Sequence, residues 1–273
     1  YDGCSMPVYL LDGDPISQSA SVYDQDQTRD GEKYVFFSLA ALGLADFLNW
    51  PIHILHANDW HTAIAIYALH RLPKRTPLLK STRTLLTLHN LPFMGMGAQT
   101  ALSSYNLPPA KDSALPEWAR HAPLPLGLLY ADRIIAVSPH YAEEILTPEY
   151  GCGLDDFLKT RQTALSGILN GLNTERWNPT SDTSIVENFS AEALNNRQLN
   201  KTHLQRQFGL EEVDDRPLLT LISRMDPQKG IDIALRGLEK FKQQAWQAII
   251  LGTGDPEIEA LARRLEVEQP ERV

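Results

Sequence analysis

Two basic residues, Arg224 and Lys229, follow an apolar run at residues 218–222 that is predicted to be a strand. They lie in the sequence Ser-Arg-Met-Asp-Pro-Gln-Lys-Gly, residues 223–230, ahead of a predicted helix. In open α/β folds, ligands bind at the carboxyl edge of the strands. Two fixed positive charges at such an edge suit a diphosphate, whose charge must be stabilised as a bond to it breaks. The alternative is that both are ordinary surface cations on a loop.

A second group of polar residues, His56, Asp59 and His61, comes after a short apolar segment. Their spacing fits no strong zinc signature, so we expect no metal there. We expect His61 near the start of a helix, where the helix dipole disfavours the imidazolium. A neutral imidazole both donates and accepts hydrogen bonds, which suits sugar hydroxyls. Asp59 could bind hydroxyls or cap the helix, and His56 could be a hydrogen-bonded core histidine.

Two further strand ends carry polar side chains. His89 and Asn90 follow the strand predicted over residues 83–88, where polar groups can line a crevice, although Asn is also favoured in turns. Asn170 ends the strand predicted over residues 165–169, beside a predicted domain boundary. Ligand sites concentrate between domains, so Asn170 is a candidate binding residue.

Gly252 and Gly254 lie at a predicted strand-to-helix turn. Two glycines there could expose backbone N–H groups to an anion or a ribose, although such a pair is common. Asp255 and Pro256 then have the residue types favoured for the N-cap and first position of a helix. The chain has no nucleophile elbow and no Walker A sequence.

The elements that position these residues alternate between strand and helix, which is typical of a parallel α/β fold. Strands are predicted at residues 8–11, 52–56, 83–88, 133–137, 165–169, 218–222 and 247–251. Helices are predicted at 35–48, from 61 to about 72, up to 131, and at 138–146, 192–208, 231–243 and 257–265. A polar loop is predicted over 13–31, and a long loop with short helical pieces over 91–123. A polar, aperiodic stretch indicates a boundary, so we expect domains over 1–175 and 176–273.

The bulk composition narrows the class of protein. The 273 residues suffice for one large or two ordinary domains, and the net charge of −9 argues against general binding to nucleic acid or anionic membranes. Cys4 and Cys152 form no disulfide framework, which favours a reducing cytoplasm. No membrane span or signal peptide is visible, and the oligomeric state stays open.

Taken together, these segments resemble the bacterial and plant glycogen and starch synthases of glycosyltransferase family 5, which usually use ADP-glucose. Six segments match in the family's order: residues 56–63, 88–95, 130–158, 165–179, 200–210 and 223–230. The resemblance implies an α/β fold of two Rossmann-like domains facing each other across a cleft, the GT-B arrangement. Both domains would be incomplete in this chain, since the family's glycine-rich donor loop and its glutamate-bearing segment lie outside it.

The resemblance also implies an activity and roles for residues. Glucose would pass from ADP-glucose to the non-reducing end of an α-1,4-glucan with retention of configuration, without a metal or other cofactor. Arg224 and Lys229 would bind the donor diphosphate, His61 would contact the transferred glucose, and Asn170 would lie near it. Within this frame we expect donor contacts at Gly252 and Gly254, and sugar or acceptor contacts at Asp59, His89 and Asn90. The expected compartment is the cytoplasm, or the plastid in a plant.

Two departures from the family and three alternatives accompany this interpretation. Asn173 replaces a common Asp and Met225 replaces a common Leu, and both replacements look tolerable. Without the segments named above, we expect this chain to be inactive by itself. The alternatives are another GT-B enzyme such as a sucrose-related synthase, a non-catalytic glucan-binding fragment, and a metallohydrolase built on His56, Asp59 and His61.

Overall fold

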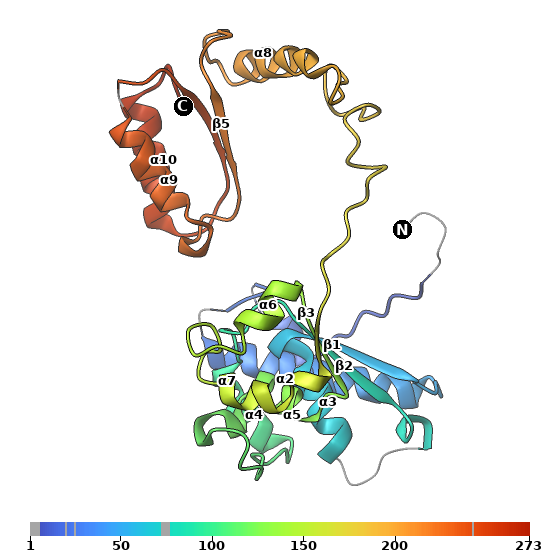
Figure 1. Cartoon of the computed structure of the whole chain (residues 1–273). Coiled ribbons are helices and arrows are strands. Elements are labelled where there is room, and N and C mark those ends of the chain that lie inside the picture. The colour runs from blue at the N-terminus through green and yellow to red at the C-terminus, as the bar shows by residue number, and fades with distance from the viewer. Residues whose placement is uncertain (1–5, 20, 25, 72–76, 242) are drawn as a thin grey trace. The chain divides into compact units, whose positions relative to one another are not determined.

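The structure is a computed structural model that describes residues 6–19, 21–24, 26–71, 77–241 and 243–273 (Figure 1). Its contacts divide the chain into two compact units, Tyr1–Gly171 and Leu172–Val273. The sequence placed the division slightly later, after residue 175. Both units combine helices with parallel strands, as the predicted α/β class requires.

The first unit is built on a parallel sheet whose strand order follows the chain. Its strands are β1 (Ile54–Asn58), β2 (Arg83–Leu88), β3 (Arg133–Ala136) and β4 (Leu165–Gly167). In this register Asn58 lies opposite Thr87, and Ala136 lies opposite both Leu88 and Gly167. The carboxyl ends of neighbouring strands are therefore adjacent, so residues that follow them gather at one edge.

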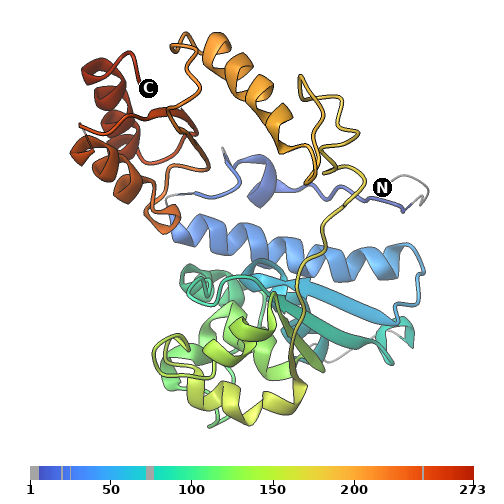
Figure 2. The same cartoon turned by 45° about the horizontal axis from the view of Figure 1, so that its top comes forward.

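Helices bury the apolar residues of the first unit. They are α1 (Asp14–Ser17), α2 (Gln27–Phe47), α3 (Asp59–Arg71), α4 (Gln99–Ser104), α5 (Pro123–Tyr130), α6 (Pro139–Glu144) and α7 (Asp155–Thr160). Figure 2 shows the long α2, and α3 packs against both α2 and α5. Residues 63–69 of α3 are all buried, as expected of a helix that is apolar around its circumference. A Cβ at Gly127 would lie 2.6 Å from Ala63 Cβ, so glycine permits the close approach of α5 to α3.

The second unit pairs two parallel strands, β5 (Leu218–Ile222) and β6 (Gln247–Leu251). Its helices are α8 (Arg197–Gln207), α9 (Ile231–Lys240) and α10 (Pro256–Glu268). An apolar cluster of α9, β6 and α10 contains Leu235, Trp246 and Leu265. The Asp255 carboxylate caps α10 by accepting from the Glu257 and Ile258 amides, as its sequence predicted.

Several predicted elements are wrong or displaced. Residues 8–11 form no strand, because Val8 and Leu10 are 82% and 94% exposed and have no neighbouring strand. Residues 27–31 belong to α2 and not to a loop, since Asp26 accepts from the Thr28 amide and starts the helix there. The loop at 91–123, by contrast, contains short helical pieces as predicted: α4 and two 3-10 turns, Met96–Ala98 and Glu117–His121. The strands predicted at 52–56, 133–137 and 165–169, and the helices at 192–208 and 231–243, differ in their ends from β1, β3, β4, α8 and α9.

Candidate functional site

Asp59 connects the carboxyl ends of β1 and β2. Its Oδ1 accepts from the His89 backbone N–H at 2.7 Å, and its Oδ2 lies 2.9 Å from His89 Nδ1. Asp59 has a left-handed φ of 53°, a conformation that Asp tolerates better than most residues. The structure thus brings together two residues that the sequence placed on separate strand ends. In the described part of the chain, both carboxylate oxygens face His89, so the capping alternative for Asp59 is not what the geometry shows.

His61 lies in the first turn of α3 among aromatic rings. Its ring centroid is 4.4 Å from that of Trp60, 4.6 Å from that of Tyr34 and 5.6 Å from that of Tyr23. Burial lowers the pKa of His61 below its ordinary value, although the charges of Asp59 and Asp30 oppose this shift. The sequence led us to expect a neutral imidazole because of the helix dipole, and in the structure burial favours the same neutral form.

The His61 imidazole has one unsatisfied atom. Its Nε2 is buried and has no hydrogen-bond partner among the residues that the structure describes. Buried polar atoms are nearly always hydrogen-bonded, and each exception needs an explanation. A neutral imidazole whose Nε2 has no partner can form one hydrogen bond with a ligand hydroxyl.

The aromatic and charged neighbours of His61 were not predicted from the sequence. The Tyr34 hydroxyl donates to the Val22 carbonyl at 2.6 Å, and burial raises the pKa of Tyr34 to about 12, with contributions from Tyr23 and Asp30. These residues lie in or next to the stretch that was predicted to be a polar loop. The one signal that could have found the helix start there was Asp26 as an N-cap, followed by helix-forming residues.

The remaining candidates of the first unit are more peripheral. His56 Nε2 lies 2.7 Å from Thr87 Oγ1, but the side chain is exposed, so the alternative of a core histidine is wrong. The Asn90 carbonyl accepts from the Phe93 amide, which is turn chemistry. Asn170 is exposed and follows the end of β4 at Gly167 without ending the strand itself.

Arg224 and Lys229 lie in the second unit, where the backbone continues its pairing beyond β5. The Met225 amide donates to the Thr253 carbonyl at 2.9 Å, and the Asp255 amide donates to the Met225 carbonyl at 2.7 Å. Met225 is buried and the neighbouring Arg224 is exposed, as alternation along an extended segment requires. This pairing fixes the backbone that carries Arg224.

Lys229 ends the 3-10 turn Pro227–Lys229, which begins where the Asp226 carboxylate accepts from the Gln228 amide. Gly230 then takes a left-handed φ of 65° to enter α9. Both Arg224 and Lys229 are exposed, and neither charged group has a hydrogen bond or ion pair within the described residues. Both cations are therefore available to an anion at the end of β5.

Gly252 and Gly254 lie so close to the backbone of residues 223–225 that a side chain at either position would clash with it. A Cβ at Gly252 would lie 2.0 Å from the Ser223 carbonyl oxygen, and one at Gly254, where φ is 157°, would lie 2.4 Å from that of Met225. The Gly254 amide donates to Glu259 Oε1 at 2.9 Å, and the Thr253 hydroxyl donates to the same oxygen at 2.7 Å. In this structure the Glu259 carboxylate is thus the hydrogen-bond acceptor of the Gly254 amide. The anion contacts that we expect at Gly252 and Gly254 stay a prediction.

The proposed metal ligands have separate partners. His56 contacts Thr87, Asp59 contacts His89, and His61 lies among aromatic rings. Over the described ranges, no group of three His, Cys, Asp or Glu side chains is placed to hold a metal ion. The metallohydrolase alternative therefore lacks the ligand cluster that it needs there. In the same residues, no helix is both long and apolar enough to cross a bilayer.

The comparisons with known proteins agree with this arrangement of strands and helices. The family described as the starch synthase catalytic domain matches residues 2–160. The catalytic domain of starch synthase IV from Arabidopsis thaliana, bound to ADP and acarbose, superimposes with a TM-score of 0.77 at 28% identity, covering 91% of this chain and 51% of that chain. This match confirms the α/β fold with parallel sheets. The chain belongs to the starch synthase catalytic domain family.

Curated relatives make the resemblance more specific. The glycogen synthase of Anaeromyxobacter sp. (strain Fw109-5) is 35% identical over 272 residues, 98% of this chain and 57% of the relative. That of Cellvibrio japonicus (strain Ueda107) is 39% identical over 248 residues, 88% of this chain and 50% of the relative. These similarities confirm the predicted resemblance to glycogen and starch synthases. The chain spans about half the length of the curated relatives it matches.

Proposed function

We propose that the protein is a glycogen synthase that transfers glucose from ADP-glucose to the non-reducing end of an α-1,4-glucan, with retention of configuration. The observation that carries this proposal is the similarity to curated glycogen synthases along nearly the whole chain. The solved relative that was bound to ADP supports the choice of donor, because ADP is the leaving group when ADP-glucose gives up its glucose. The cytoplasm is the compartment we propose.

Arg224 and Lys229 are the residues that we assign to the diphosphate. Both are exposed at the end of β5 and have no partner of opposite charge within the described residues. Charge develops on the diphosphate as the bond to glucose breaks, and positioned cations stabilise it. They can do this without a metal ion, so the proposed reaction needs none.

His61 is the residue that we assign to the transferred sugar, together with Asp59 and His89 at the adjacent strand ends. The free Nε2 of a neutral imidazole can bond to a hydroxyl, and the Asp59–His89 pair adds polar groups beside it. Asn170 follows β4 at the same carboxyl edge of the sheet, which supports a role near the sugar. Such catalysis relies on positioning and charge stabilisation and not on a covalent nucleophile.

The test is transfer of radiolabelled glucose from ADP-glucose to glycogen by the protein expressed from its complete reading frame. We expect Arg224→Ala and Lys229→Ala each to lower kcat by roughly 100-fold or more, the cost of losing one stabilising group. Arg236→Ala is the matched control, because Arg236 is an exposed arginine of α9 without a described partner. Normal turnover in both variants would overturn the assigned roles.

The same assay separates the alternatives. Preference for UDP-glucose with a sucrose-type acceptor would identify a sucrose-related enzyme. Binding of glycogen without any transfer would identify a non-catalytic glucan-binding protein. Release of free sugar in place of transfer, stopped by a chelator, would favour a metal-dependent hydrolase.

A further inference from the structure

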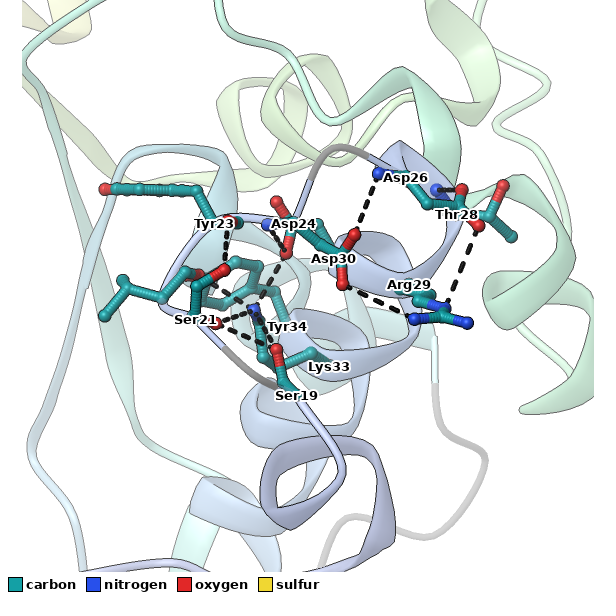
Figure 3. A network of polar contacts seen from close by, with 11 residues as sticks. Ser19, Ser21, Tyr23, Asp24, Asp26, Thr28, Arg29, Asp30, Lys33 and Tyr34 are labelled. Atoms are coloured by element: carbon teal, nitrogen blue, oxygen red, sulfur yellow. Dashed lines mark hydrogen bonds and ion pairs between the residues drawn. The ribbon is translucent and has the colours of Figure 1, made fainter. Parts of the chain in front are cut away.

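A buried ion pair lies near the start of α2. Asp30 and Lys33 are each 6% exposed, and Lys33 Nζ lies 2.8 Å from Asp30 Oδ1 (Figure 3). Burying two charges costs several kcal/mol per ion, which the pair offsets only when further hydrogen bonds satisfy both groups. The other hydrogen-bond partners of Asp30 and Lys33 therefore indicate the structural role of this buried pair.

Those partners all belong to the segment that precedes α2. Lys33 Nζ donates to Ser19 Oγ at 3.0 Å, to the Ser21 carbonyl at 3.1 Å and to the Val22 carbonyl at 2.8 Å. Asp30 Oδ1 accepts from the Asp24 amide at 3.0 Å. Figure 3 shows the bonds from Ser19 and Ser21 meeting at the Lys33 ammonium.

The segment held in this way carries Tyr23. Its side chain is 60% exposed, so packing does little to fix it, yet its ring centroid lies 5.6 Å from that of His61. The position of the Tyr23 ring depends on the backbone of residues 21–24. In this segment the Ser21 and Val22 carbonyls accept from Lys33, and the Asp24 amide donates to Asp30. The buried pair is thus connected to His61 through the backbone that carries Tyr23.

We propose that Lys33 is a positioning residue that, by donating to the Ser21 and Val22 carbonyls, holds Tyr23 against His61. Tyr23 then forms one wall beside the imidazole, which limits how a ligand can approach Nε2. The meaning of this contact for sugar transfer rests on the proposed function, whereas the contact itself does not. Lys33 touches no candidate substrate position, so the positioning effect proposed here passes through Tyr23 and is separate from the direct effect of the Lys33 charge on His61.

The test is NMR of the His61 ring protons in the 13C-histidine-labelled chain, at a pH where the imidazole is neutral. The Tyr23 ring shifts these protons by its ring current, and His61→Gln assigns them. We expect Lys33→Met to move the His61 signals in the same direction as Tyr23→Ala and by at least half as much. In the Tyr23→Ala background, Lys33→Met should add almost nothing.

Glu32→Gln is the matched control, because Glu32 is an exposed charged residue of the same helix turn whose side chain has no partner within the described residues. It should leave the His61 signals in place. Lys33 also lies 5.1 Å from the Tyr34 ring, and its charge acts on His61 directly. An equal shift from Lys33→Met with and without Tyr23 would show action by one of these routes and overturn the proposal. Unchanged His61 signals in a folded Lys33→Met chain would overturn it too.

A second variant covers the case in which Lys33→Met does not fold. Ser19→Ala removes one acceptor of Lys33 from a half-buried position without disturbing the ion pair. It should give a smaller shift of the same sign that disappears in the Tyr23→Ala background, and no shift would contradict the proposal. Because these readouts do not involve glucose transfer, failure of the positioning role and failure of the proposed function are distinguishable.

Discussion

Asp59 shows how one residue can organise the edge of a sheet. Its left-handed backbone carries an energetic cost for a residue with a Cβ, of order 1–3 kcal/mol for such sparsely populated conformations. The two contacts with His89, one to the backbone and one to the ring, offset that cost. A strained residue that is held by a specific contact at a strand end is a common feature of functional sites.

His61 leads to a prediction about pH. Burial lowers its pKa in the folded chain, whereas an unfolded histidine titrates near 6.5. Below about pH 6.5 the unfolded state therefore binds the proton first, and the free energy of unfolding decreases as the pH falls toward the folded pKa. We expect the wild type to lose more stability between about pH 7.5 and pH 5.5 than His61→Gln, measured by urea denaturation.

His53→Gln serves as the control for this measurement, because His53 is an exposed histidine of the same unit. It should show the pH dependence of the wild type. An identical pH dependence in His61→Gln and the wild type would contradict a buried, neutral His61.

At the scale of elements, the close approach of the backbones that follow β5 and β6 depends on glycine. A Cβ at Gly252 would meet the Ser223 carbonyl oxygen at 2.0 Å, so the paired backbones must separate to admit it. We expect Gly252→Ala to lower the free energy of unfolding of the second unit by about 2 kcal/mol or more, in the range of backbone strain and overpacking. Thermal or urea unfolding followed by circular dichroism measures this change.

Gly237→Ala is the matched control for Gly252→Ala. Gly237 lies inside α9, and a Cβ there would meet nothing within 4 Å. Alanine should stabilise the helix by roughly 0.5–1 kcal/mol, because it loses less backbone entropy than glycine. Both substitutions replace glycine with alanine, yet they should change the free energy of unfolding in opposite directions. If both changed stability equally, the close backbone approach at Gly252 would not be the cause.

The elements also show which parts of the fold can be predicted from the sequence. β2, β5 and β6 have the predicted bounds, since each is a short apolar run between polar residues. Residues 8–11 are equally apolar but have no neighbouring strand, so composition alone was misleading there. The start of α2 was missed because its first turns bury a charged pair in place of apolar residues.

The same distinction applies to the candidate site. Asp59 and His89 could be placed together from the sequence, since parallel strands end at one edge. The contact of Tyr23 with His61 could not, because it depends on hydrogen bonds between a segment without regular structure and α2. Tertiary contacts of this kind leave no periodic signal in the sequence.

At the scale of the whole molecule, each unit has its own apolar core. The second unit begins with residues 172–193, which contain turns but no helix or strand. Local bonds support this stretch, such as those from the Glu175 and Arg176 amides to Asn173 Oδ1. A segment with exposed residues and few buried contacts is where proteases cut first.

We therefore expect limited trypsin digestion to cut early after Arg176, which is exposed in that irregular stretch. The fragment that ends at Arg176 keeps the core of the first unit, so it should retain cooperative thermal unfolding by circular dichroism. Mass spectrometry identifies the cut, and Arg176→Gln should delay it without changing the fold. Cleavage inside α10, for example after Arg264, before any cut at Arg176 would show that this helix opens more readily than the irregular first residues of the second unit.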